Sequence, residues 1–196
     1  MTSSLLANDK PLLVGLTAPA GSDKDSVARY LETRHGLIPI ALADPIRDML
    51  AELLRHAEAD GFWLTEPAFK EQPIPGLGVS YRHLAQTLGT EWGRKLIAPD
   101  LWRRIAERKV RQALGVGDSV VVTDVRFPDE AEWLRALGGS LVRVVRVNGL
   151  PMVRPHESEQ HAHALDADHE LPNDSSLGAL EHCIDTLVND LRSAAA

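Results

Sequence analysis

The fold is decided by the stretch LLVGLTAPAGSDKDS, residues 12–26, in which an apolar run leads through a turn into a helical pattern. Residues 12–17 predict a buried strand, and residues 25–32 predict a helix that turns Val27, Ala28 and Leu31 toward a sheet. A loop between a buried strand and a helix N-terminus attracts phosphate, because backbone N–H groups and the helix dipole point into it. The stretch therefore suggests a phosphate-binding loop.

The spacing departs from the usual pattern of such loops, which is Gly, four residues, Gly, Lys and then Ser or Thr. Ala18 and Asp23 stand at the two glycine positions, and Asp25 separates Lys24 from Ser26. Lys24 offers a mobile positive charge, and Ser26 offers a hydroxyl for Mg²⁺. Asp23 visits positive φ more readily than most residues, yet its charge lies near a phosphate unless it turns outward or meets a cation. The alternative is an ordinary strand, turn and helix with Lys24 in solvent.

Composition sets limits on the class of protein. A chain of 196 residues with 44% hydrophobic and 25% charged residues predicts one domain with a substantial core. A net charge of −7 argues against a general nucleic-acid binder. The single cysteine, Cys183, fits a reducing compartment. Since no run approaches the roughly 18 apolar residues of a membrane span and no signal peptide is evident, we expect a cytoplasmic protein without a membrane partner.

Further strands and helices alternate along the chain. Residues 37–42 predict a strand at a sheet edge because of Pro39, and Asp44 is expected to cap a helix that starts at Pro45. Residues 57–80 predict a long irregular connection, of the kind that is often functional or mobile. Helical patterns follow from Tyr81 to about Trp92 and from Asp100 to about Leu114, where Leu101 and Ile105 are expected to face inward and Trp102 is a further candidate. The later predictions are a strand at 120–123, a helix from 128, a strand at 141–147, a turn at Asn148-Gly149, a polar loop over 151–174 and a last helix from about 177.

This alternation indicates an α/β fold with a mainly parallel sheet covered by helices on both faces. Ligands of such folds bind at the carboxyl ends of the strands. Asp124 directly follows the buried run Val120-Val121-Val122-Thr123, so we expect it near the residue 15–26 loop. A carboxylate there can hold Mg²⁺ beside a phosphate loop, and Arg126 can grip a phosphate with its fork of donors. Both residues could instead only brace the following helix.

Three blocks of sequence resemble one family. They are LGTEWGR at 88–94, PDLW at 99–102 and DVRFPDEAE at 124–132, and their order agrees with that of the bacteriophage deoxynucleoside monophosphate kinases. Segments ADPIR at 43–47 and HESE at 156–159 are also similar to family segments. The resemblance spans about residues 12 to 190. It implies a P-loop kinase fold and transfer of the γ-phosphoryl group of ATP to a deoxynucleoside monophosphate with Mg²⁺.

The resemblance also implies roles for particular residues. The loop would hold ATP through Gly21, Ser22, Asp23, Lys24, Asp25 and Ser26. Ser26 and Asp124 would hold the metal, and the residues that carry catalysis would be Lys24, Asp25, Arg82 and Arg126. The acceptor nucleotide would contact Asp44, Arg47, Arg82, Gly89, Thr90, Trp102, Asp124, Arg126 and Glu130. A homodimer is likewise implied by the resemblance alone.

Several alternatives stay open at this stage. Aromatic residues at the spacing of Tyr81 and Trp92 are more often core than base-stacking surfaces. The altered loop also fits a nucleotide-binding protein without catalysis, or a P-loop kinase of another small acceptor. His156, His161, His163 and His169, with nearby acids, raise the further alternative of a metal site, although their spacing is irregular. The base that is accepted is left open by the sequence.

Overall fold

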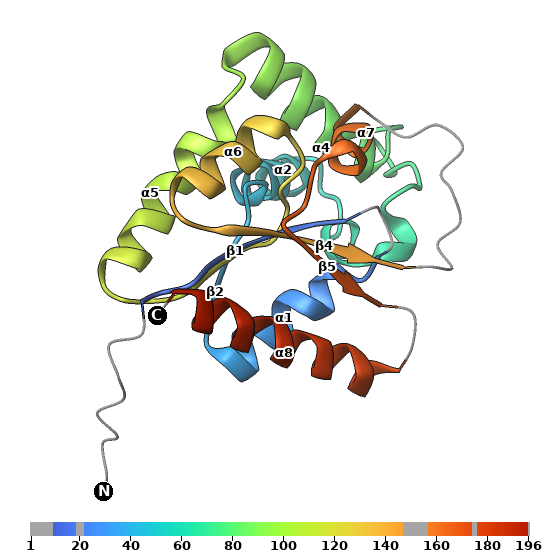
Figure 1. Cartoon of the computed structure of the whole chain (residues 1–196). Helices are drawn as coiled ribbons and strands as arrows, with labels where there is room; N and C mark the ends of the chain where they lie inside the picture. Colours follow the sequence, from blue (N-terminus) through green and yellow to red (C-terminus); the bar gives the residue numbers. More distant parts are fainter. Residues whose placement is uncertain (1–9, 19–21, 147–156, 174–175, 196) are drawn as a thin grey trace, which may run out of the picture. The chain divides into compact units, whose positions relative to one another are not determined.

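The computed structural model describes residues 10–18, 22–146, 157–173 and 176–195. The chain divides into two compact units, Met1–Ile40 with Glu107–Ala196, and Ala41–Ala106. The first unit contains the predicted sheet and the start of the phosphate loop, and the second unit is inserted between its two parts (Figure 1). Helix α5, Leu101–Gly115, crosses the second boundary.

The first unit is built on a five-stranded sheet with the order β2-β3-β1-β4-β5, in which every neighbouring pair is parallel. The strands are β1 (Leu13–Thr17), β2 (Ile38–Ile40), β3 (Val120–Val122), β4 (Ser140–Val145) and β5 (His169–Pro172). The predicted parallel α/β fold is therefore confirmed, and β2 with its Pro39 lies at an edge. Strands β1 and β3, whose residues are fully buried, lie inside the sheet.

Helices cover both faces of this sheet (Figure 1). Helices α1 (Lys24–His35) and α8 (Leu177–Ala195) pack on one face, where Leu16, Val27 and Ile184 belong to one buried cluster. Helix α6 (Pro128–Ala136) packs on the other face. There the backbone of Gly15 approaches Leu134 so closely that a Cβ at position 15 would collide with that leucine side chain.

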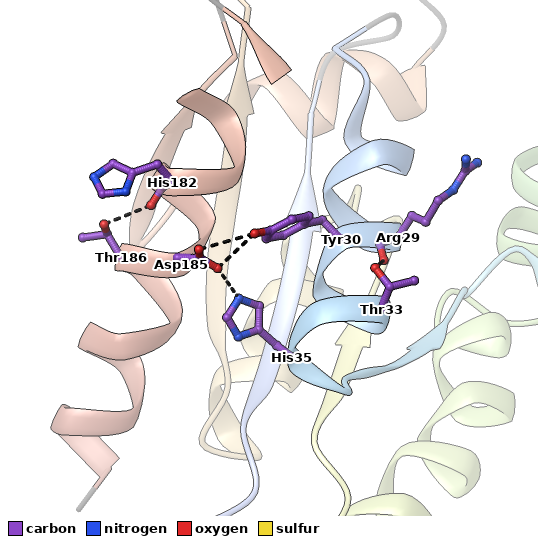
Figure 2. Close-up of polar contacts among 7 residues, drawn as sticks. All are labelled: Arg29, Tyr30, Thr33, His35, His182, Asp185 and Thr186. Atoms are coloured by element: carbon purple, nitrogen blue, oxygen red, sulfur yellow. Dashed lines mark hydrogen bonds and ion pairs between the residues drawn. The ribbon is translucent and has the colours of Figure 1, made fainter. Parts of the chain in front are cut away.

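A polar cluster joins α1 to α8 (Figure 2). The Asp185 carboxylate of α8 lies 2.8 Å from Nε2 of His35 and accepts a hydrogen bond of 3.3 Å from the Tyr30 hydroxyl. Tyr30 and His35 both come from α1, and their rings meet edge to face. Because α1 begins at the phosphate loop, this cluster fixes the far end of the helix that presents the loop.

The prediction of a polar loop over residues 151–174 is wrong for residues 157–164 and 169–172, and residues 151–156 lie outside the described residues. Residues 157–164 form α7 (Glu157–Ala164), and β5 extends the sheet beside β4. Asp168 makes this possible, since its N–H donates to Leu141 O and its carboxylate accepts from Leu141 N at 2.7 Å and from Arg135. The predicted turn at Asn148-Gly149 lies outside the described residues.

The second unit is helical. It contains α2 (Asp44–His56), α3 (Phe62–Thr65), the 3₁₀ turn η1 (Pro67–Phe69), α4 (Tyr81–Gln86), the π-helix η2 (Thr87–Ile97) and the start of α5. Phe62, Trp63 and Phe69 gather into an aromatic cluster within the predicted irregular segment. Ser80 caps α4 by accepting a hydrogen bond from His83 N at 3.2 Å.

Two local predictions in this unit need correction. Asp44 is the first residue of α2, not its N-cap, and its carboxylate reaches back to Ala41 N at 3.2 Å. In α5 the buried residues are Trp102, Ala106, Val110 and Ala113, whereas Ile105 is 40% exposed. The apolar stripe of α5 is thus rotated by about one residue, because Trp102 and not Leu101 fills the interior.

Candidate active site

The described part of the phosphate loop begins α1 with an unusual cap. Asp23 has φ 59° and ψ 33°, the left-handed conformation that a glycine would normally supply. Its carbonyl accepts from Ser26 N at 3.1 Å, and its carboxylate Oδ1 accepts from the Ser26 hydroxyl at 2.8 Å. The ammonium of Lys24 lies 2.7 Å from Asp25 Oδ1. Gly21 and two residues before it lie outside the described residues.

A residue that sequence reasoning did not single out supports this loop from the far end of the chain. Asn173, which follows β5, donates from Nδ2 to the carbonyl of Ser22 at 3.0 Å. Asn173 lies in the span that the sequence predicts as a polar loop, and no local signal connects it with a residue about 150 positions earlier. The amide therefore positions the loop backbone through a contact that exists only in the folded sheet.

Asp124 lies at the same edge of the sheet as the loop. Thr123 N donates to Ile40 O and Val125 N donates to Leu16 O, so the backbone on either side of Asp124 is fixed to β2 and β1. Its side chain is 6% exposed. Since β1 and β3 are parallel neighbours, Asp124 and the start of α1 follow carboxyl ends of adjacent strands, as predicted.

The loop after Asp124 is held by a buried glutamate. Glu130 is 3% exposed, and its Oε2 accepts from the backbone N–H groups of Arg126 at 2.8 Å and Phe127 at 3.0 Å. The ring of Phe127 also meets His161 of α7, with centroids 5.3 Å apart. Glu130 therefore braces the start of the following helix, a role that the sequence suggested only for Asp124 and Arg126. It fixes the backbone that carries the half-buried Arg126 side chain.

In the second unit, Gly89 and Thr90 lie buried inside the π-helix. Glycine and threonine are poor continuations of an α-helix, and here the chain continues through the wider turn of a π-helix. The indole N–H of Trp102 donates to Gly89 O at 2.7 Å, and Trp102 is 4% exposed. The indole can approach because position 93 is glycine, where a Cβ would lie 2.6 Å from Trp102 Cε2. In this conformation Trp102 is an interior side chain.

The charged residues of this unit that the sequence predicts at the acceptor site form ion pairs. Asp44 Oδ1 accepts from Arg47 Nη1 at 3.1 Å. Arg82 forms an ion pair with Glu71, and its N–H donates to Lys70 O. Tyr81 is the first residue of the helix that contains Arg82. The pKa of its hydroxyl is raised, because the effect of burial exceeds the opposing effect of the Arg47 charge. Arg47 and Arg82 thus present guanidinium groups whose anionic partners are partly exposed carboxylates.

The predicted site residues fall into two sets, one in each unit. The first set shares one edge of the sheet, and its members are Ser22, Asp23, Lys24, Asp25, Ser26, Asp124, Arg126 and Glu130. The second set lies in the inserted unit, and its members are Asp44, Arg47, Arg82, Gly89, Thr90 and Trp102. Within the described ranges, no group of three or more histidine, cysteine or acidic side chains is placed to hold a metal ion. His156 is outside these ranges.

Comparison with known proteins gives matches at three levels. The family model described as deoxynucleotide monophosphate kinase matches residues 77–184. A predicted deoxynucleotide monophosphate kinase of Acanthamoeba polyphaga mimivirus is 31% identical over 158 residues, which cover 76% of this chain and 80% of that protein. The deoxynucleoside-5′-monophosphate kinase of Escherichia phage T5 is 36% identical over 110 residues, covering 53% of this chain and 43% of the phage enzyme.

Solved structures support the fold. The protein TT1252 from Thermus thermophilus superposes with a TM-score of 0.50 at 20% identity, covering 92% of this chain and 98% of that one. A predicted kinase from Chloroflexus aurantiacus gives a TM-score of 0.50 at 13% identity, with 95% and 99% of the two chains covered. Among the helices of the described residues, none combines the length and apolar character needed to cross a membrane.

Proposed function

The chain belongs to the deoxynucleotide monophosphate kinase family and has a P-loop kinase fold, and from this premise we propose that it transfers the γ-phosphoryl group of ATP to a deoxynucleoside monophosphate. The products are the deoxynucleoside diphosphate and ADP. The observation that carries the proposal is the placement of the Asp23–Ser26 turn and Asp124 after adjacent parallel strands. Phosphoryl transfer depends mainly on positioning and charge neutralisation, and this edge of the sheet offers both.

The donor set fits a nucleotide bound with Mg²⁺. Mg²⁺ prefers oxygen ligands, and the Ser26 hydroxyl and the Asp124 carboxylate supply oxygen from the ends of neighbouring elements. We assign the metal to these two residues and the donor phosphates to the loop from Gly21 to Ser26. When bound, the metal neutralises charge on the phosphates. Lys24 adds a mobile ammonium group. Because this group is paired with the Asp25 carboxylate, it must leave Asp25 in order to bind a phosphate oxygen.

We propose acceptor-binding residues in each unit by itself. In the first unit, Arg126 binds the phosphate of the acceptor nucleotide. Glu130 is a positioning residue, because its carboxylate accepts a hydrogen bond from the backbone of Arg126. In the inserted unit, Arg82 supplies a second positive charge, and its guanidinium group leaves Glu71 when it binds phosphate. In the same unit, we assign acceptor contacts to the π-helix segment at Gly89 and Thr90, and Trp102 is a positioning residue through its bond to Gly89. Asp44, Arg47 and Asp124 complete the proposed acceptor contacts.

The surroundings of the reaction follow from charge and from the family. With a net charge of −7, we propose that the protein binds small phosphorylated ligands and not nucleic acid. A homodimer in the cytoplasm is part of the same proposal. Sedimentation of the purified chain tests the dimer, since a monomer at assay concentration would contradict it.

The decisive experiment supplies ATP, Mg²⁺ and each of the deoxynucleoside and ribonucleoside monophosphates in turn, and measures nucleoside diphosphate formation. We expect product with at least one deoxynucleoside monophosphate and loss of turnover in Arg126→Ala. Arg135→Ala is the matched control, because Arg135 is an arginine in the last turn of α6 that pairs with Asp168 and is not among the predicted site residues. If the protein binds nucleotide but forms no product with any acceptor, it is a nucleotide-binding protein without kinase activity. If product forms only with another phosphorylated acceptor, the proposed substrate class is wrong.

A further inference from the structure

Asp23 occupies the position before the loop lysine where a phosphate loop ordinarily has glycine. The backbone there keeps the left-handed conformation, with φ 59°. Aspartate is one of the few residues other than glycine that visit this region at modest cost. The turn is therefore retained, and what the substitution adds is a carboxylate beside the site proposed for the donor phosphates.

The position of this carboxylate is specific. Its Oδ1 lies 2.8 Å from Ser26 Oγ, and the side chain caps no backbone N–H of α1. Lys24 is the cation nearest to Asp23 in the sequence, but its ammonium group pairs with the carboxylate of Asp25. Adjacent oxygen ligands of an octahedral Mg²⁺, with bonds of about 2.05 Å, lie about 2.9 Å apart. Ser26 Oγ donates a hydrogen bond to Asp23 Oδ1 at this separation, which is also that of two neighbouring ligands of one Mg²⁺, so one cation can bind both oxygens without moving them apart.

We propose that Asp23 makes binding of the nucleotide donor conditional on Mg²⁺. With the metal present, the carboxylate shares the cation with Ser26, and without the metal it repels the donor phosphates. The inference rests on the proposed function, because donor and metal are those of the kinase reaction. Two like charges about 4 Å apart at a protein surface change an affinity by about tenfold or more, even with substantial solvent screening.

The test measures ADP affinity by calorimetry, once with excess Mg²⁺ and once with a chelator. For the unaltered protein we expect much weaker binding in the chelator. In Asp23→Asn, which keeps the left-handed turn and an oxygen acceptor, the metal-free affinity rises at least about tenfold and the ratio of the two affinities falls by the same factor. Asp23→Gly, which keeps the backbone conformation, gives the same result if the Asn variant does not fold.

The control is Glu32→Gln, which removes one negative charge from an exposed position near the other end of α1. It should leave the ratio of affinities unchanged. An Asp23→Asn ratio equal to that of the unaltered protein would overturn the inference. If the unaltered protein still makes nucleoside diphosphate in that case, the proposed function stands. If it binds no ADP with or without Mg²⁺, both proposals fail.

Discussion

The indole of Trp102 donates its N–H to the carbonyl of Gly89 across 2.7 Å of buried interior. Gly89 begins the pair that the family resemblance implies in acceptor binding, and its neighbour Thr90 is buried in the same π-turn. A π-turn leaves backbone groups out of the usual helical register, so a side-chain donor from another helix stabilises it. Trp102 therefore joins α5 to the segment in which the acceptor contacts are proposed.

Trp102→Phe should destabilise the protein and weaken acceptor binding together. A smaller aromatic ring remains, so a cavity opens where the buried indole packed, and the Gly89 carbonyl loses its partner. Together these changes cost about 2–4 kcal/mol of the free energy of unfolding. Urea denaturation and the KM for the acceptor measure the two effects. Trp92→Phe, at a partly exposed ring of the same cluster, is the control and should cost less than about 1 kcal/mol. A stable Trp102→Phe variant with an altered KM would argue for direct nucleotide contact instead.

Glu130→Ala should destabilise the loop that carries Arg126. Removing the carboxylate leaves the buried N–H groups of Arg126 and Phe127 without this acceptor, at a cost of about 2–4 kcal/mol. Glu130→Gln retains one acceptor oxygen and should cost less. Since Glu130 is assigned a positioning role, both variants should raise the acceptor KM in proportion to their loss of stability. Glu132→Ala, at an exposed position of the same helix, should change neither quantity.

Gly15→Ala and Gly178→Ala should have opposite effects on stability. At position 15 the new methyl group collides with Leu134 and lies 3.1 Å from Val125 Cγ2, so we expect a loss of about 1–3 kcal/mol. At position 178 in α8 a Cβ meets no atom within 4 Å, and the higher helix propensity of alanine predicts a gain of up to about 1 kcal/mol. Thermal unfolding measures both. A neutral Gly15→Ala variant would contradict the close packing of β1 against α6.

The Tyr30 hydroxyl should make stability depend on alkaline pH. Burial, followed by the charge of Asp185, raises the pKa of Tyr30 above its ordinary value of 10.0. An acid whose pKa is higher in the folded state loses its stabilising contribution as pH rises from 10.0 through the folded pKa.

Denaturation between pH 8 and pH 11 should therefore show a smaller alkaline loss of stability in Tyr30→Phe than in the unaltered protein. Tyr81, whose pKa burial also raises, continues to titrate in that variant and serves as the internal reference. Equal alkaline losses in the two proteins would show that the Tyr30–Asp185 contact of Figure 2 does not persist in solution.

The sequence predicted the elements whose signals are local. The buried run before Gly15 predicted β1, Pro39 predicted an edge strand, and the β-branched residues 120–122 predicted the strand beside the loop. Each of these signals lies in a few consecutive residues, because β-branched side chains and proline restrict the backbone wherever they occur. Alternation of strands and helices then implied the parallel sheet.

The structure of residues 157–172 could not be predicted in this way. His169-Glu170-Leu171-Pro172 contains one strongly apolar side chain, too few to indicate a strand. It becomes β5 because Asp168 pairs with the backbone of Leu141 and because Leu171 is buried. These contacts link residues about 27 positions apart, and no pattern within the segment records them.

The features of the candidate site also divide into those that local sequence determines and those that packing determines. By itself, the sequence determined which residues could meet a phosphate, because charge, hydroxyl groups and the strand-loop-helix order are local properties of residues 12–26 and 120–130. Only the tertiary structure decided that Asn173 binds the carbonyl of Ser22, that Glu130 is buried beneath the Arg126 loop and that Trp102 is buried on Gly89. Burial and hydrogen-bond partners depend on packing between distant segments, and packing assigns each polar group either to a ligand or to the fold.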